Sequence, residues 1–462
     1  MVRFDMPCRI VSGAVEYFRE HMALGDYLTE EGQAEMTWVG KGCERLGIRG
    51  RCELTHFENL CRGLHPETGA KLMVRDKGAN RRVCYFGQIS PPKDVSLLYL
   101  VGGETRIGGW WQDAMRETLA EIEAVTATRV RRDGADDDRC TGNMVAAIVT
   151  HDASRALDPQ LHTHVCIMNL TYDAAEERWK GVQPSGYFKH QGYFREVCYN
   201  KLAARFLDAG YELEQVRGIG FNIAGMPATL RDRFSKRRRT IVERAAMLGA
   251  TTQDAWQTIA GQTREAKTHS TAKDLRNGWL AEAGGELTEL RAVVARAVEQ
   301  TKETPSMSAS DALLSGEAHL FERRSVADER VVLREALVAG RGQVDLSGLK
   351  GALADRILNG ELVRSESEVA SREGLASEKE FVAWASTAPP VGRWGVVPDM
   401  AGLGSDQVAA VERVMSATGR VLILQGDAGT GKTTCLKAII EGIQGGDGRV
   451  FGCAPSSGAA GA

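Results

Sequence analysis

Three of the nine histidines, His151, His162 and His164, are grouped in one short segment of the sequence. His162 and His164 are two residues apart, so on a β-strand both imidazoles leave the same face. The polar stretch 152–160 predicts a loop that brings His151 alongside them, between strands at 144–149 and 165–168. Neutral imidazoles bind divalent ions, and three of them leave coordination positions open for substrate oxygens. We therefore predict a divalent metal site that can do chemistry, with Mg²⁺, Mn²⁺, Zn²⁺ and Ni²⁺ as the candidate ions.

A phosphate-binding loop lies at 426–433, where Gly-Asp-Ala-Gly-Thr-Gly-Lys-Thr has the GxxxxGK[ST] spacing. A β-rich run at 421–424 precedes it and an amphipathic stretch at 434–443 follows, which is the strand, loop and helix order that the motif needs. The residues expected to hold ATP and its Mg²⁺ are Gly426, Gly429 and Gly431 through backbone N–H groups, Lys432 through its charge, and Thr433 through its hydroxyl.

The composition narrows the class of protein. The 462 residues carry a formal net charge of −3, with basic residues clustered at 129–132 and 231–239. Such a cluster can bind phosphate, although a charge run is more often a solvated helix face. The ten cysteines include no CxxC pair, which argues against a disulfide framework and a cysteine zinc knuckle and favours a reducing compartment. No apolar run is long enough to span a membrane, so we expect a cytoplasmic protein without membrane insertion.

A chain of this length is expected to form two to four domains. Its first part mixes β-rich runs, such as 83–89 and 95–101, with helical stretches, which predicts an α+β fold. Because few residues follow Lys432 and a parallel ATPase sheet needs several βα units, we expect an N-terminal fragment of a longer protein. The expected segments are 1–230, a catalytic α+β domain; 231–304, a helical lid or arm; 305–395, a helical module with a little β structure; and 396–462, the start of an α/β P-loop domain.

Two tyrosines near the N-terminus, Tyr17 and Tyr27, are candidate nucleophiles. Their separation is close to three helical turns, so a single helix could present both on one side, although Gly25 could interrupt it. A phenol ionises near pH 10, so a nucleophilic tyrosine needs a base or a cation close by. Simple packing of both rings is the alternative.

Taken together, the sequence resembles the conjugative relaxase-helicases of the MobF type, which nick a plasmid strand at the origin of transfer and then unwind it. The matching pieces stand in family order: the tyrosine region, 38–42 (Trp-Val-Gly-Lys-Gly), 90–96 (Ser-Pro-Pro-Lys-Asp-Val-Ser), the histidine segment ending at Asn169, 234–237 (Phe-Ser-Lys-Arg) and the P-loop. The resemblance implies an antiparallel HUH-type palm with a helical lid, then a winged-helix-like module, then the start of a 5′–3′ helicase domain.

The resemblance also implies roles for single residues. Tyr17 matches the tyrosine that attacks a DNA phosphate and stays linked to the 5′ end, and Tyr27 matches the second tyrosine. The three histidines would hold the ion on the scissile phosphate, and Gln407 resembles a glutamine that contacts adenine. The implied partners are single-stranded plasmid DNA at the transfer origin, together with conjugation accessory and coupling proteins.

Further phosphate contacts are expected from Arg155, Lys93, Lys236 and Arg237, each of which could instead serve only in packing or at the solvent surface. One position departs from the family. Phe86 stands where an acidic residue is usual, and the spacing does not select Asp26, Asp94 or Asp152 as its replacement.

Two other classes remain open at this stage. The first is a non-catalytic DNA-binding module with a structural metal site, in which the loss of the carboxylate has silenced nicking. The second is a metal-dependent oxygenase of the cupin type, where HxH with a distant histidine also occurs. The second class leaves Tyr17, the basic clusters and the P-loop without a role.

Overall fold

The computed structural model describes residues 1–5, 7–22, 35–73, 82–132, 134–216, 219–263, 271–299, 306–387, 395–419, 421–427 and 429–453. The chain divides into two compact units, Met1–Val369 and Ala370–Ala462, and each is described by itself. No helix among the described residues is long and apolar enough to cross a membrane.

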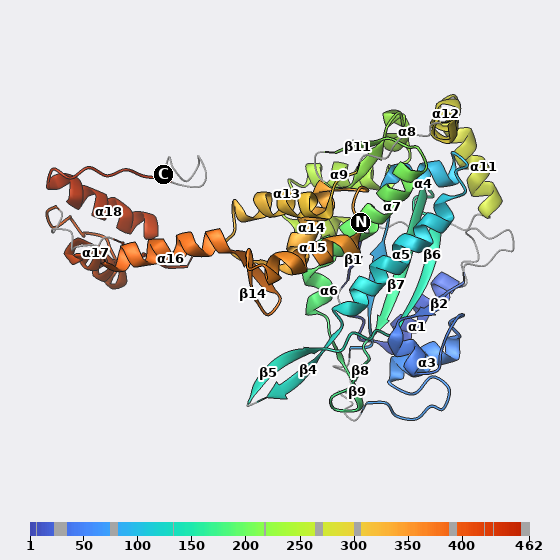
Figure 1. Ribbon diagram of the computed structural model, residues 1–462, viewed down its shortest axis with the longest axis horizontal. Coiled ribbons are helices and arrows are strands. Elements are labelled where there is room, and N and C mark those ends of the chain that lie inside the picture. The colour runs from blue at the N-terminus through green and yellow to red at the C-terminus, as the bar shows by residue number, and fades with distance from the viewer. Residues whose placement is uncertain are drawn as a thin grey trace. The chain divides into compact units, whose positions relative to one another are not determined.

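A five-stranded antiparallel sheet forms the centre of the first unit (Figure 1). Its strands, in spatial order, are β1 (Val2–Phe4), β3 (Cys84–Ile89), β7 (Pro159–Met168), β6 (Ala146–Ala153) and β2 (Thr37–Val39). This single sheet, with helices packed on it, differs from the double-sheet roll that a cupin requires. The predicted α+β class with an antiparallel sheet is confirmed.

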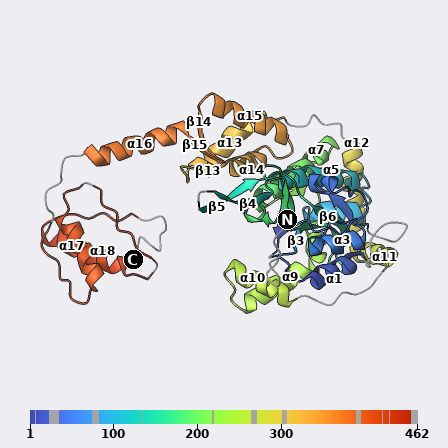
Figure 2. The same ribbon diagram turned by 90° about the horizontal axis from the view of Figure 1, so that it is seen from below.

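Helices cover both faces of this sheet, as Figure 2 shows. On one side lie α4 (Lys93–Leu100), α5 (Ile107–Ala124) and α7 (Gln191–Asp208); on the other lie α1 (Val11–Met22), α2 (Lys41–Arg45) and α3 (Leu54–Arg62). The alternation of β7 serves both cores, because Val165 and Ile167 pack on the α5 side whereas Cys166 and Met168 pack on the α3 side. One strand therefore builds two cores and still has positions left for a site.

The run 95–101, which the sequence predicts as β-rich, lies almost entirely within helix α4, so that prediction is wrong. Most residues of α4, including the polar Asp94 and Ser96, are buried. A helix buried nearly all round lacks the apolar stripe that marks a surface helix, so its sequence reads like a buried strand. Pro92 lies at the N-cap, directly before the first helical residue, where its missing N–H costs the helix no hydrogen bond.

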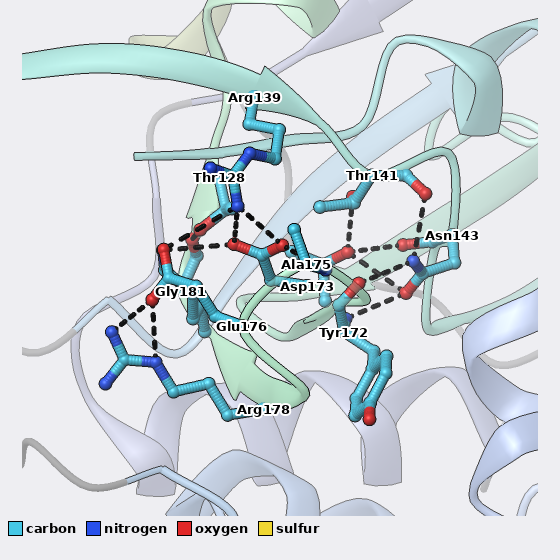
Figure 3. A network of polar contacts seen from close by, with 12 residues as sticks. Thr128, Arg139, Thr141, Asn143, Tyr172, Asp173, Ala175, Glu176, Arg178 and Gly181 are labelled. Carbon is cyan, nitrogen blue, oxygen red and sulfur yellow. Dashed lines mark hydrogen bonds and ion pairs between the residues drawn. The ribbon is translucent and has the colours of Figure 1, made fainter. Parts of the chain in front are cut away.

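At the end of the sheet away from the histidines, small strands form a polar network (Figure 3). The strands are β4 (Ala127–Arg132), β5 (Ala135–Cys140), β8 (Thr171–Asp173), β9 (Arg178–Lys180) and β10 (Val182–Gln183). The buried Asp173 accepts two hydrogen bonds from Arg139, both 3.0 Å, and one from Lys180 at 3.2 Å. These contacts join β5, β8 and β9.

The described residues of the segment after the sheet are mainly helical. Its elements are α8 (Ala228–Arg233), α9 (Lys236–Met247), α10 (Gln253–Gln262), α11 (Ala272–Ala283) and α12 (Glu286–Glu299). Before it come α6 (Ser185–Lys189) and the hairpin of β11 (Leu213–Gln215) and β12 (Phe221–Ile223). Trp279 of α11 donates a hydrogen bond of 2.7 Å to the backbone oxygen of Leu157, so these helices contact the turn between β6 and β7.

A further group of elements docks on α7. It comprises α13 (Ala309–Phe321), β13 (Ala327–Asp328), α14 (Glu329–Ala339), α15 (Leu346–Leu358), β14 (Leu362–Ser365) and β15 (Glu368–Ser371), with sheet order β13-β15-β14. The buried Asn200 of α7 donates to Val344 O and accepts from Gly342 N, each at 2.7 Å. Gly342 has a φ of +74°, and a Cβ there would lie 2.9 Å from the backbone of Ala203, so only glycine fits.

The second unit contains α16 (Arg372–Thr387), α17 (Ser405–Ser416) and α18 (Lys432–Gly445). Val411 of α17 packs against Cys435, Ala438 and Ile439 of α18. The strand predicted at 421–424 is not formed. Residues 395–419, 421–427 and 429–453 contain no other strand that could accept its backbone hydrogen bonds, which explains the difference.

Candidate active site

The three predicted metal ligands lie on one face of the sheet. His151 is directly opposite His162 in the register of β6 and β7, and His164 is two residues further along β7. Directly opposite residues of antiparallel strands point to the same side, as do residues two apart on one strand. The turn between the strands is shorter than expected, because β6 runs to Ala153 and β7 begins at Pro159.

The imidazole rings are in mutual contact. The ring centroids of His151 and His162 are 5.6 Å apart, those of His151 and His164 are 5.2 Å apart, and those of His162 and His164 are 4.9 Å apart. Three imidazoles on one ion, with metal–nitrogen bonds of about 2.1 Å, have ring centroids roughly 5 Å apart. The spacing of the rings therefore fits a single ion.

The imidazole rings have the spacing of a metal site, but their nitrogen atoms do not converge on one point. Among the described residues, no three histidine, cysteine, aspartate or glutamate side chains already have their ligand atoms arranged around one point. The spacing is fixed by the strand register, whereas rotation about the Cβ–Cγ bond of a histidine is soft. The trio could hold a divalent ion after such a rotation.

His162 is prepared to act as a ligand by its surroundings. Its Nδ1 lies 2.9 Å from the backbone oxygen of Gln160. Because a carbonyl oxygen only accepts, Nδ1 carries the proton, and in the neutral ring Nε2 keeps its lone pair. Burial lowers the pKa of His162, although the Gln160 contact opposes this, so the neutral form is favoured.

Helix α1 places Tyr17 over the same face. The Tyr17 Oη lies 2.9 Å from His164 Nδ1, with the direction of donation set by the tautomer of His164. The Tyr17 ring also contacts Phe86 of β3, with ring centroids 3.9 Å apart. Phe18, the next residue, is buried against Phe57 of α3, so it belongs to the core. Tyr27 lies outside the described residues.

Behind the histidines, a polar pair fixes β7 from the other core. Trp111 of α5 donates from Nε1 to Thr163 Oγ1 at 3.0 Å, and Thr163 Oγ1 lies 2.8 Å from Thr150 Oγ1 of β6. Thr163 separates His162 from His164 in the sequence and points to the opposite face. It therefore holds the register of the histidine strands.

Two of the predicted phosphate-binding lysines instead contact the turn between β6 and β7. Lys93 Nζ donates 2.7 Å to Pro159 O, and burial lowers its pKa to about 8. Lys236 donates from its backbone N to Asp158 Oδ2 at 2.9 Å, and its Nζ pairs with Glu282 at 2.7 Å. Both lysines stabilise this turn and remain only predicted phosphate ligands.

The other members of the 231–239 cluster divide between internal contacts and the surface. Arg231 pairs with Asp94 at 2.8 Å, and Arg237 donates to Ala260 O at 3.0 Å. Arg238 and Arg239 are exposed. Arg155 is half-buried in the turn after β6. A basic run in the sequence is therefore only partly a basic surface in the fold.

Two of the carboxylates considered as replacements for the acidic residue missing at position 86, Asp94 and Asp152, lie on the α4 side of the sheet. Asp94, besides its pairing with Arg231, accepts a hydrogen bond of 2.8 Å from Ile223 N. Asp152 is buried, which raises its pKa to about 7, and the charge of Arg276 opposes this rise. Asp26 lies outside the described residues. Neither described carboxylate has a hydrogen bond or ion pair to the histidines or Tyr17 that the structure records.

Sequence reasoning missed three residues that build the site: Asp158, Trp111 and Thr163. Their roles depend on contacts between distant segments, which spacing does not reveal. Gln88 is a fourth, directly opposite His164 in the register of β3 and β7. The alternation of β3, which places Cys84, Phe86 and Gln88 on one face, is the signal that could have found it.

The structure brings the predicted nucleotide-binding residues of the second unit together. Gly429 and Gly431 have φ values of +83° and +80°, and Lys432 begins α18. Lys432 Nζ donates to Gly426 O at 2.7 Å and to Asp427 O at 2.6 Å. Thr433 follows on α18, and Gln407 Nε2 donates to Thr430 O at 3.0 Å, so Gln407 contacts the loop itself.

Two parts of the chain match known protein families. Residues 11–285 match the family model described as TrwC relaxase, and residues 402–462 match one described as AAA domain. Two curated relatives are called multifunctional conjugation protein TraI. The protein from Escherichia coli strain K12 is 29% identical over 316 residues, which are 64% of this chain and 18% of that protein. The other, from Escherichia coli, is 30% identical over 308 residues, 62% of this chain and 17% of that protein. This chain thus spans less than a fifth of the length of these relatives.

Solved structures of the conjugative relaxase TrwC in complex with oriT DNA are also similar. The metal-bound structure has a TM-score of 0.55 and 28% identity, and the match covers 61% of this chain and 97% of that chain. The copper-bound structure has a TM-score of 0.56 and 29% identity, with 62% and 99% covered. A complex with a 27-mer DNA that comprises the recognition hairpin and the cleavage site has a TM-score of 0.53 and 28% identity, with 62% and 99% covered. The family model covers more than half of the sequence, including Tyr17 and the three histidines, and the fold agrees with the solved structures, so this chain belongs to the TrwC relaxase family.

Proposed function

We propose that this chain is a metal-dependent DNA strand transferase that nicks single-stranded DNA at a plasmid transfer origin. The observation that carries the proposal is the contact of 2.9 Å between Tyr17 Oη and His164 Nδ1, at the edge of a cluster of three imidazoles. A possible nucleophile and a possible metal site therefore share one sheet face. The TrwC structures with oriT DNA and with metal support this assignment.

Tyr17 is the nucleophile in this proposal. Its phenolic oxygen attacks the scissile phosphorus in line, the bond from phosphorus to the 3′ oxygen breaks, and the 3′ oxygen takes up a proton. The product is a 5′-phosphotyrosyl link, which conserves the energy of the phosphodiester, so the strand can be rejoined without ATP. Because a free phenol ionises near pH 10, its anion needs a nearby group that stabilises it. A neutral His164 that binds the ion through Nε2 carries its proton on Nδ1, which lies 2.9 Å from Tyr17 Oη and can donate to the phenolate.

A divalent ion held by His151, His162 and His164 would supply positive charge to the phosphate oxygens as negative charge develops there. The chain's own residues hold this site in place. The register of β6 and β7 sets the positions of the imidazoles, and the Gln160 carbonyl fixes the His162 tautomer. The candidate ions are Mg²⁺, Mn²⁺, Zn²⁺ and Ni²⁺.

Two further assignments belong to this proposal. The elements from α13 to β15 follow the order helix, strand, helix, helix, strand, strand, with one three-stranded sheet, which supports a winged-helix-like module. The P-loop residues from Gly426 to Thr433 support binding of ATP with Mg²⁺ as part of a 5′–3′ helicase. Tyr27 and the accessory and coupling proteins remain predictions from the resemblance, and Arg155 and Arg237 remain predictions from their places in the sequence.

The function is tested by covalent adduct formation. The protein is incubated with Mn²⁺ or Mg²⁺ and single-stranded oligonucleotides from the transfer origin of its own plasmid, and the intact mass is measured. The parent should gain the mass of the cleaved 5′-phosphorylated strand, and Tyr17→Phe should not, because the substitution removes only the hydroxyl. DNA affinity should be unchanged in Tyr17→Phe.

Tyr172→Phe is the matched control, since Tyr172 is also half-buried but lies at the other end of the sheet, under Arg45. It should form adduct at the parent's rate. A peptide map that places the DNA on another tyrosine, with Tyr17→Phe still active, would contradict the assignment. Tight DNA binding by the parent without any adduct would favour the non-catalytic DNA-binding module, the alternative that Phe86 at an acidic position of the family leaves open.

A further inference from the structure

Phe86 and His164 are diagonal neighbours on the face of the sheet that lies under Tyr17. In the register of β3 and β7, Phe86 is opposite Cys166 and Gln88 is opposite His164. Phe86 and His164 are therefore on adjacent strands, one pleat apart, and point to the same side. This places two side chains of different chemistry beneath one tyrosine.

Tyr17 contacts both of these side chains, Phe86 with its ring and His164 with its hydroxyl oxygen. The Tyr17 and Phe86 ring centroids are 3.9 Å apart with an interplanar angle of 33°, so the two rings overlap at a tilt. At the other end of the phenol, Oη is 2.9 Å from His164 Nδ1. A contact on the ring face fixes the ring plane, and a contact at the oxygen fixes where the ring points.

We propose that Phe86 is a positioning residue for Tyr17, holding the phenol in the plane and direction from which its oxygen can meet a phosphate. This inference rests on the proposed function and adds to it a role for a side chain without polar atoms. A hydrocarbon ring can neither accept a proton nor bind an ion, so Phe86 acts only through geometry and by excluding water. Reactions of bound groups are sensitive to such geometry, because a displacement of about 1 Å can slow them about a hundredfold.

Packing alone is the competing explanation, and the neighbouring residue separates the two. Phe18 lies on the same helix as Tyr17 and is buried, with its ring centroid 4.6 Å from that of Phe57. Phe86 is only half-buried and stands at the border of the same core. A substitution at Phe18 therefore disturbs the packing of α1 without removing a contact of the Tyr17 ring that the structure records.

The kinetic test compares Phe86→Ala, Phe86→Tyr and the packing control Phe18→Leu, after circular dichroism has shown that each is folded. At saturating origin DNA, Phe86→Ala should form the Tyr17 adduct at least tenfold more slowly than the parent, while the dissociation constant for DNA stays within twofold. Phe86→Tyr, which restores an aromatic face, should return to within threefold of the parent rate, with the adduct still mapped to Tyr17. Equal rates for Phe86→Ala and the parent, or equal slowing by Phe18→Leu, would overturn the inference.

A second measurement does not depend on catalysis. In protein labelled with 3-fluorotyrosine, the ¹⁹F signal of Tyr17 is identified by its loss in Tyr17→Phe. Ring-current and ordering effects from Phe86 should displace this signal from the position of a solvent-exposed tyrosine, and Phe86→Ala should move it back. An unchanged Tyr17 signal in Phe86→Ala would overturn the positioning role even if the parent cuts DNA. If the signal moves but the parent makes no adduct, the proposed function fails and the geometric role of Phe86 stands.

Discussion

A histidine binds a metal ion only in its neutral form, and the surroundings of His162 favour that form. Burial lowers its pKa, and the Gln160 carbonyl holds the proton on Nδ1. Because the ion competes with a proton for Nε2, a lowered pKa lets the ligand stay neutral to a lower pH than an exposed histidine with a pKa of about 6.5. The metal site should therefore keep its His162 ligand in mildly acidic solution.

The double substitution of His162→Ala and His164→Ala should abolish stoichiometric binding of a divalent ion, since two of three ligands are removed. Calorimetric titration with Mn²⁺ and Zn²⁺ at pH 7 measures the stoichiometry. The control is His56→Ala with His65→Ala, which removes two half-buried histidines that lie outside β6 and β7. Binding by the His162 and His164 variant at the parent's stoichiometry would rule out this ligand set.

At the scale of residues, the sequence predicted that the histidines share one face but not the residues that support them. The HxH spacing works as a signal because alternation in a strand has a period of two residues, so spacing alone places His162 and His164 on one face. Thr163, Trp111 and Asp158 give no such signal, because each acts through a hydrogen bond to a segment distant in the sequence. The contact between Tyr17 and Phe86 was hidden for the same reason.

At the scale of elements, docking of α13 to β15 on α7 depends on polar contacts in a buried place. Asn200 satisfies both Val344 O and Gly342 N, and Gly342 allows the close approach of the loop to α7. These residues come from segments that the sequence assigned to different domains, and no periodic pattern links them. The sequence predicted the helices of this segment, whereas their docking could be seen only in the structure.

Asn200→Ala should destabilise this contact, because it leaves a buried donor and a buried acceptor without a partner, at about 1 to 3 kcal/mol for each. We expect the urea midpoint of the first unit to fall and the amide of Gly342 to exchange with deuterium much faster. Asn359→Ala, at the exposed end of α15, is the control and should change neither quantity. Parent-like protection of Gly342 in Asn200→Ala would show that packing alone holds the loop.

Errors in predicting elements have two physical origins in this chain. The run 95–101 resembled a strand because helix α4 is buried nearly all round and shows no helical stripe. The run 421–424 has the composition of a strand, but a strand forms only where a neighbour accepts its hydrogen bonds. Local composition thus predicts surface helices and paired strands well. It fails to predict elements whose burial or strand pairing depends on the rest of the fold.

At the scale of the whole molecule, the two units differ in how complete their sites are. In the first unit Tyr17 and the three histidines already lie together. In the second, Lys432 is bonded to the carbonyls of its own loop, at Gly426 and Asp427, and the preceding run is not paired in a sheet. A nucleotide would have to displace these contacts before Lys432 could reach its phosphates.

We therefore expect these 462 residues to bind ATP weakly and to show no hydrolysis that DNA stimulates. Titration with a fluorescent ATP analogue and a phosphate-release assay with single-stranded DNA measure both properties. Lys432→Ala should change little, as should the control Lys437→Ala on the same helix. Robust hydrolysis that disappears in Lys432→Ala but not in Lys437→Ala would show that the nucleotide site works as it stands.

The hydroxyl pair of Thr163 and Thr150, with Trp111 behind it, has a consequence for how this protein can evolve. Thr163 lies between the candidate ligands His162 and His164 in the sequence, but its side chain packs in the core on the opposite face of the sheet. A change in that core can therefore alter the positions of the histidines. A substitution that most protein cores tolerate would here shift the register of β6 and β7, on which the positions of the histidines depend. We expect natural variation on the α5 side to be coupled to the chemistry of the other side, so that lineages change Trp111 and Thr163 together or keep both.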